Sequence, residues 1–229
     1  MSCHILSAYD EELDFLSHRI VEMGVISRRM VDSSVRAFIE GDAVLAHKVI
    51  DNDIVLDQLE RDIGDKAIIT IAKRQPMASD LREIVGSIRI AADLERIGDL
   101  AKNTAQRVLA LQMFGVPRKL VLAIEPLADL SLEQISEILE VYGNRSIEKT
   151  QLICSRDGEL DAMHTSLFRK LLTYMMEDSR NIILCTHLLF CSKNIERIGD
   201  HVTNIAETIH YMTTGIQPHI ERLRKEDCE

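Results

Sequence analysis

The chain has 229 residues, of which 46% are hydrophobic and 28% charged, and 27 Lys and Arg against 37 Asp and Glu give a formal charge of −10 at pH 7. The apolar share excludes a disordered chain, and the acidic balance argues against a nucleic-acid-binding protein, because no basic excess is present to neutralise phosphates. Five scattered cysteines without a CxxC spacing exclude a disulfide scaffold and fit a reducing cytosol.

The N-terminus lacks the basic start and apolar core of a signal peptide. The longest apolar run, residues 182–191, is interrupted by Thr186 and His187 and is too short to span a bilayer. We therefore expect a soluble cytoplasmic protein that is not an integral membrane protein.

Widely separated Gly, Pro and Asn residues divide the chain into long segments whose composition favours helix over strand. Six helices are predicted, at about 8–40, 42–75, 79–113, 119–142, 145–177 and 179–214. The connections are short, so consecutive helices should run antiparallel. Pro126 is expected to mark either the true start of the fourth helix or a kink within it.

The chain contains an internal duplication. The segment Leu94–Asp99 recurs as Ile195–Asp200, Asn103 matches Asn204, and Asp53 and Asp57 match Asp157 and Asp161. The repeating unit is therefore three helices, and the predicted fold is all-α, with two tandem antiparallel three-helix bundles. The predicted units are 1–115 and 118–216, followed by a C-terminal tail at 217–229, with the boundary near Gly115–Pro117.

Two acidic stripes follow from helical periodicity. Successive residues on a helix are rotated by about 100°, so Glu95, Asp99 and Asn103 share one face. Glu196, Asp200 and Asn204 share the equivalent face in the second repeat. Each stripe lies roughly opposite the apolar positions of its own helix segment, so we expect it near the surface of its bundle. A solvated face is the ordinary explanation of such a pattern, but like charges four residues apart repel each other, and no cation lies three or four residues from Glu95.

Antiparallel pairing brings further carboxylates to the same level. If the second and third helices turn around Met77, residues 95–99 lie opposite Asp57, with Asp53 and Glu60 one turn to either side. A turn near Asp178 likewise places residues 196–200 opposite Asp157 and Asp161, with His164 next along the stripe. Four or five carboxylates converging without basic partners would repel strongly unless cations bind or the pKa values rise.

Hard oxygen donors with an occasional imidazole suit divalent ions such as Mg, Mn, Fe, Ni or Zn. The predicted metal ligands are Asp53, Asp57, Glu95, Asp99, Asp157, Asp161, Glu196 and Asp200. The predicted accessory ligands are Glu60, Asn103, His164 and Asn204.

Gly98 and Gly199 occupy the same position of each repeat, although glycine inside a helix costs about 1 kcal/mol relative to alanine. The repetition indicates a close approach that a side chain would block, either at a metal site or in tight helix packing.

Other chemistry is sparse. The sequence has no phosphate-binding loop, dinucleotide fingerprint or nucleophile elbow. Glu207 and His210 form the ExxH spacing that di-iron helical bundles use, but Gln106 and Leu109 stand near the equivalent places of the first repeat. A di-metal enzyme and a metal-free helical interaction module remain as alternatives.

The paired ERIGD segments resemble those of the PhoU family of phosphate-signalling regulators. The resemblance covers nearly the whole chain and includes residues 71–76, 78–82 and 172–180. It implies a non-enzymatic regulator that binds multinuclear metal clusters through (E/D)xxxD motifs, which here match the four pairs of predicted ligands. It also implies negative regulation of the phosphate-starvation response and of phosphate uptake, linking the ATPase of a phosphate ABC transporter to a sensor histidine kinase. The resemblance also implies a cytoplasmic homodimer that is recruited to the membrane only through those partners.

Overall fold

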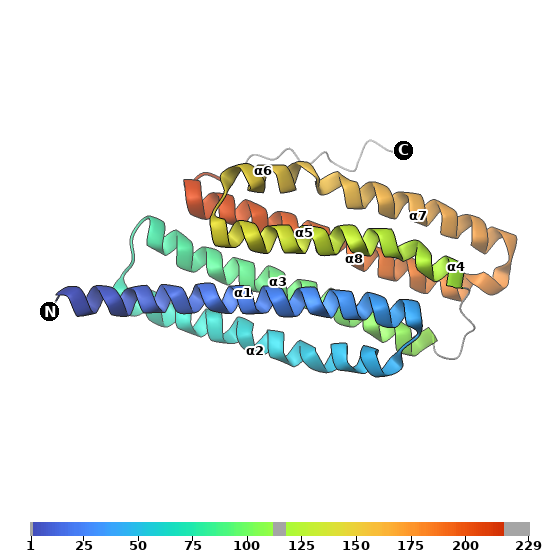
Figure 1. Ribbon diagram of the computed structural model, residues 1–229, viewed down its shortest axis with the longest axis horizontal. Coiled ribbons are helices and arrows are strands. Elements are labelled where there is room, and N and C mark those ends of the chain that lie inside the picture. Colours follow the sequence, from blue (N-terminus) through green and yellow to red (C-terminus); the bar gives the residue numbers. More distant parts are fainter. Residues whose placement is uncertain (1, 112–117, 218–229) are drawn as a thin grey trace.

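A computed structural model describes residues 2–111 and 118–217, and every long element in these ranges is a helix (Figure 1). The first repeat comprises α1 (Ser2–Glu40), α2 (Ala43–Arg74) and α3 (Ser79–Leu111). The helices run back and forth along the long axis of the molecule, which confirms the antiparallel all-α arrangement.

Local turn chemistry explains where the helices of the first repeat end. Gly41 adopts a φ of 68°, and the side chain of Asp42 accepts a hydrogen bond from the amide of Leu45 at 3.0 Å to cap α2. Gln75 takes the left-handed conformation at the end of α2, and Pro76 then prevents the helix from continuing. These signals fix the α1–α2 and α2–α3 turns close to the predicted positions.

The second repeat has the same course but is interrupted twice. It comprises α4 (Arg118–Val121), the 3₁₀ turn η1 (Leu122–Ile124), α5 (Glu125–Asn144), α6 (Ile147–Ser155), α7 (Asp157–Glu177), the 3₁₀ turn η2 (Ser179–Asn181) and α8 (Ile182–Thr214). Pro126 lies in the first turn of α5, as expected for a proline at a helix start.

The prediction of one continuous helix over 145–177 is wrong, because α6 ends at Ser155 and α7 begins at Asp157. The side chain of Arg156, at the break, lies 3.2 Å from carboxylate oxygens of both Glu137 and Glu159. The prediction of one helix over 119–142 is also wrong, because η1 separates α4 from α5.

A single apolar core runs through both repeats. Helices α3 and α8 pack against each other in the middle of the molecule, with α2 outside α3 and α7 outside α8 (Figure 1). Leu94 and Ile97 of α3 and Ile198 and Ile205 of α8 are buried members of one apolar cluster that includes residues of both repeats. None of the described helices is both long enough and apolar enough to cross a membrane. The predicted boundary at Gly115–Pro117 and nearly all of the tail at 217–229 fall outside the described residues.

Candidate metal centre

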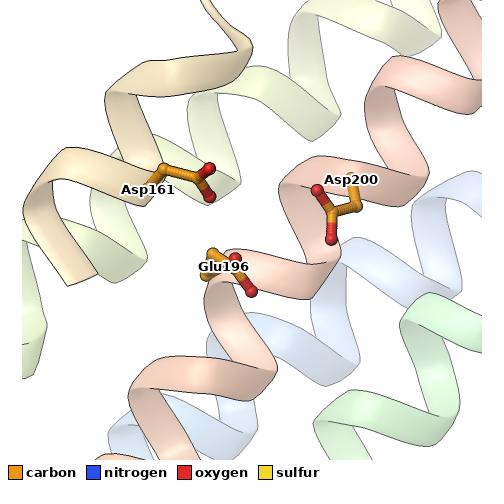
Figure 2. Close-up of side chains that lie close together, drawn as sticks. All are labelled: Asp161, Glu196 and Asp200. Carbon is orange, nitrogen blue, oxygen red and sulfur yellow. The ribbon is translucent and has the colours of Figure 1, made fainter. Parts of the chain in front are cut away.

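Three carboxylates of the second repeat converge between α7 and α8. One oxygen from each of Asp161, Glu196 and Asp200 lies within 4.8 Å of the others. Figure 2 shows Asp161 on α7 pointing toward the two carboxylates of α8. The pairing of Asp161 with the 196–200 segment agrees with the level match that antiparallel geometry predicts. We refer to these three residues as the second cluster.

Glu196 is the buried member of the second cluster, with a relative exposure of 2%. The expectation that the whole stripe lies near the surface is therefore wrong for this residue, because α5, α6 and α7 all pack against α8. The ammonium of Lys193, one turn earlier on α8, lies 2.5 Å from a carboxylate oxygen of Glu196. Burial of a carboxylate is costly unless cations or hydrogen-bond donors stabilise it, so this position favours a positively charged partner.

Two other predicted ligands of the second repeat, His164 and Asn204, contact polar side chains outside the second cluster. Nδ1 of His164 lies 3.0 Å from the hydroxyl of Ser192. The amide nitrogen of Asn204 donates to Asp93 of α3 at 3.3 Å, so Asn204 contributes to the packing between repeats. The backbone of Asp157 begins α7, but its side chain is not among those described. Ligation by these three residues stays a prediction.

The equivalent carboxylates of the first repeat, between α2 and α3, enclose a lysine. Nζ of Lys102 lies 2.5 Å from Oδ2 of Asp53 on α2 and 3.2 Å from Oδ1 of Asp99 on α3. Asp57 lies 3.7 Å from Arg61 of its own helix. The prediction that no basic partner serves these carboxylates is therefore wrong. We refer to Asp53, Asp57, Glu60, Glu95 and Asp99 as the first cluster.

Glu95 carries the electrostatic strain of the first cluster. Burial is the largest cause that raises its pKa, the charges of Asp99, Glu60 and Asp57 act in the same direction, the neighbouring guanidinium of Arg96 opposes them, and the net result is a pKa of about 7. Arg96 lies 3.5 Å from Glu95 and 3.0 Å from Asp99. The charges of Glu60 and Asp57 on α2 thus act on Glu95 across the helix pair, and ligation of a metal by these residues stays a prediction.

Asn103, by contrast, is exposed one turn beyond Asp99, and its ligation stays a prediction.

The two helical glycines make room for leucines of the facing helices. A Cβ added to Gly98 would collide with the side chain of Leu56 on α2, and one added to Gly199 would collide with Leu160 on α7. The predicted close approach is confirmed at both positions, and it is helix packing that requires it. The glycines thereby set the spacing at which the carboxylates of each helix pair face each other.

The donor set of the second cluster fits a divalent cation. It offers hard carboxylate oxygens from two helices, which are the ligands that Mg²⁺ and Mn²⁺ prefer. A bound ion would tie α7 to α8.

Lys102 was not predicted to take part in these sites. Its position three residues after Asp99 on the same helix could have indicated a contact between the two side chains.

Comparison with known proteins places this geometry in a family. The PhoU domain pattern matches residues 20–108 and 124–209, one copy in each half of the chain. The chain is 66% identical over 219 residues to the phosphate-specific transport system accessory protein PhoU homolog of Rhizobium meliloti, covering 96% of this chain and 92% of that protein. It is 42% identical to the homolog of the same name from Caulobacter vibrioides, covering 94% of each protein.

Solved structures agree with the sequence comparison. The crystal structure of PhoU from Pseudomonas aeruginosa superposes with a TM-score of 0.87 at 31% identity, covering 91% of this chain and all of that one. The fold also matches PhoU from Streptococcus pneumoniae, with a TM-score of 0.85 at 24% identity over 93% of this chain and all of that one. The protein belongs to the PhoU family of phosphate transport accessory proteins.

Proposed function

We propose that this protein is a metal-binding cytoplasmic regulator that restrains phosphate uptake and the phosphate-starvation response. The observation that carries the metal-binding part is the convergence of Asp161, Glu196 and Asp200 from two helices. The regulatory part is supported by relatives that are accessory proteins of phosphate-specific transport systems and that match over nearly the whole chain.

The carboxylates of both clusters would hold the cation. In the second repeat Asp161 would supply an oxygen from α7, while Glu196 and Asp200 would supply oxygens from α8. A bound divalent ion supplies positive charge that offsets the repulsion among these groups. Asp161 and Glu196 would then hold α7 and α8 in register and present a fixed surface to a protein partner.

The partners we propose are the ATPase of the phosphate ABC transporter and the cytoplasmic part of a sensor histidine kinase. A regulator that joins two such proteins needs a rigid surface rather than a reaction centre. Among the described residues, the ExxH histidine His210 lies 3.2 Å from the carbonyl oxygen of Ile216, at the end of α8 and two turns or more beyond Asp200. This placement favours an adaptor over a di-metal enzyme, and we propose that the adaptor is a homodimer.

A genetic experiment tests the regulatory proposal. Deletion of the gene should raise phosphate-starvation reporter output in phosphate-rich medium, and the wild-type gene should restore repression. A gene carrying both Asp161→Asn and Asp200→Asn should restore it poorly at equal protein level, whereas Asp129→Asn, an exposed carboxylate on α5, should restore it fully. Unchanged output in the deletion strain would refute the regulatory role.

A binding experiment tests the partners. Purified protein should bind the purified transporter ATPase and the cytoplasmic part of the kinase, and sedimentation should give the mass of a dimer. Binding to neither protein, with metal present or absent, would refute the adaptor role.

A further inference from the structure

A groove lies between α1 and α2, which run side by side from the turn that joins them (Figure 1). Its volume is about 410 Å³, within the range of about 300–1,000 Å³ that is usual for small-molecule sites. Apolar side chains, among them Met30, Leu45 and Val49, form part of its lining. The groove is therefore large enough to hold a small organic molecule and offers it an apolar surface.

The rest of the lining is basic and polar. Arg29 and Ser33 lie one helical turn apart on α1 and border the groove together. Lys48 and Asn52 have the same relation on α2. No Asp or Glu is among the described residues that line the groove, although the chain has a formal charge of −10. An acidic protein thus contains a groove whose charged lining residues are both cations.

The protein itself does not neutralise these two cations. Arg29 and Lys48 are exposed, and within residues 2–111 and 118–217 neither side chain forms an ion pair or a hydrogen bond. The adjacent Arg28, by comparison, donates from Nε to the hydroxyl of Ser136 on α5 at 2.7 Å. Arg29 and Lys48 are therefore available to form charge-assisted hydrogen bonds with a bound anion.

The duplication locates the same place in the second repeat. A shift of 104 positions carries Asp53 to Asp157, and it also carries the buried Ser27 of α1 to the buried Ser131 of α5. By this shift α1 corresponds to α5, and the first turns of α2 correspond to α6. The side chains at the α1–α2 groove can therefore be compared one by one with those of the second repeat.

The second repeat contains an ion pair at the equivalent place. The shift carries Ser33 to Glu137 and Asn52 to Arg156. The guanidinium of Arg156 lies 3.2 Å from the carboxylate of Glu137. The fold thus accommodates opposite charges across these helices, whereas the first repeat has two neutral polar side chains at the same positions.

The two cations of the groove have no basic counterparts in the second repeat. The shift carries Arg29 to Glu133 and Lys48 to Leu152. Because the second repeat forms the same helices with an acidic and an apolar residue at these positions, helix packing does not require the two cations. A ligand from outside the chain explains why both of them line one groove.

We propose that the α1–α2 groove binds a small phosphate monoester whose organic part covers the apolar lining. A phosphate monoester at pH 7 carries about 1.5 to 2 negative charges and three strong acceptor oxygens. Arg29 and Lys48 match this charge, and the hydroxyl of Ser33 and the amide of Asn52 supply further donors. A carboxylate offers one charge and two oxygens, so it matches this lining less well. The inference does not depend on the metal binding proposed above.

Calorimetric titration of adenosine 5′-monophosphate (AMP) into the full chain tests the proposal, with inorganic phosphate and adenosine as separate probes. EDTA is present throughout, so that metal held by the carboxylate clusters cannot bind the phosphate. AMP should bind more tightly than either of the other two probes. Inorganic phosphate that binds as tightly as AMP would overturn the role of the organic part, and adenosine that binds as tightly would overturn the role of the phosphate. Absence of AMP binding would overturn the inference.

Single substitutions locate the binding. Arg29→Gln and Lys48→Met should each weaken AMP binding by about tenfold, because each removes a charge-assisted hydrogen bond. Arg28→Gln is the matched control, since it removes the same charge one residue away from a side chain that contacts α5. It should leave AMP binding unchanged. Equal weakening by Arg28→Gln and Arg29→Gln would indicate a general effect of net charge and would overturn the assignment to this groove.

A double substitution tests the comparison between the repeats. Ser33→Glu combined with Asn52→Arg places in the groove the ion pair that Glu137 and Arg156 form in the second repeat. This variant keeps Arg29 and the net charge of the chain, but it should lose AMP binding because the new pair fills the groove. Circular dichroism checks that every variant is folded. Undiminished AMP binding by the folded double variant would overturn the inference.

Discussion

The α2–α3 and α7–α8 helix pairs have the same arrangement but differ in the groups that surround their clustered carboxylates. In the first pair a lysine bridges Asp53 and Asp99, and solvent reaches part of the cluster. In the second pair three carboxylates converge, and Glu196 is buried. The comparison teaches that a duplicated motif conserves spacing through packing, while the charge balance of each copy depends on single residues nearby.

What the two pairs share is the glycine–leucine contact, and its disruption should have the largest effect on stability. Gly98→Val and Gly199→Val should each lower the free energy of unfolding by about 3 kcal/mol, at the upper end of the usual cost of overpacking, because the added side chain displaces Leu56 or Leu160. Gly64→Val on α2 is the matched control, since nothing lies within 4 Å of its added Cβ. Denaturant unfolding measures all three.

Similar losses at positions 98 and 199, with little change at 64, would show that the two repeats use one packing device. A loss of stability at only one of the two positions would show that the two repeats do not share this packing contact.

What distinguishes the pairs is Lys102, and its removal from metal-free protein should have an intermediate effect. Lys102→Met should lower the free energy of unfolding by about 1.5–2 kcal/mol, because Asp53 and Asp99 lose a charged hydrogen-bond partner that is itself partly exposed to solvent. Lys149→Met is the control: Lys149 pairs with Glu140 at 2.6 Å, but both side chains are at least half exposed. Such a surface pair contributes about 0–1 kcal/mol.

Equal losses for Lys102→Met and Lys149→Met in thermal or chemical unfolding would mean that Lys102 is an ordinary surface lysine, and the contrast between the clusters would fail.

The smallest expected effect is a pH dependence that originates in the first cluster and that changes the free energy of unfolding by at most about 1.4 kcal/mol for each pH unit. Folding raises the pKa of Glu95 from 4.5 to about 7. Between these values the folded protein keeps a proton that the unfolded chain has released, so the free energy of unfolding falls as the pH rises from about 4.5 to about 7. Unfolding in the presence of EDTA should show this slope, and Glu95→Gln should flatten it.

Glu125→Gln, at an exposed position of α5, serves as the control and should leave the slope intact. A slope that survives Glu95→Gln unchanged would place the pH dependence elsewhere in the protein.

Much of the fold could be predicted because helix boundaries depend on local chemistry. Asp42 and Gln75–Pro76 act through bonds and conformations within a few residues, so periodicity and composition located the turns beside them. The break at Arg156 could not be predicted in this way. Arg156 contacts Glu137, which lies 19 residues earlier on α5, and this contact exists only after α5 and α6 have packed.

The candidate site likewise has features that the sequence predicts and features that depend on how the helices pack. The level match between Asp161 and Glu196 could be predicted because rise per residue and turn position fix which residues face each other in antiparallel helices. The link from Lys102 to Asp53 crosses between helices, so inspecting the neighbours of Glu95 on one helix did not reveal it. The burial of Glu196 depends on the helices that pack against α8, and the sequence of one helix face does not indicate them.

Anomalous diffraction from crystals grown with Mn²⁺ tests the central claim most directly. We predict a peak enclosed by Asp161, Glu196 and Asp200. No peak at the second cluster at saturating Mn²⁺, or a peak at the first cluster alone, would contradict the account.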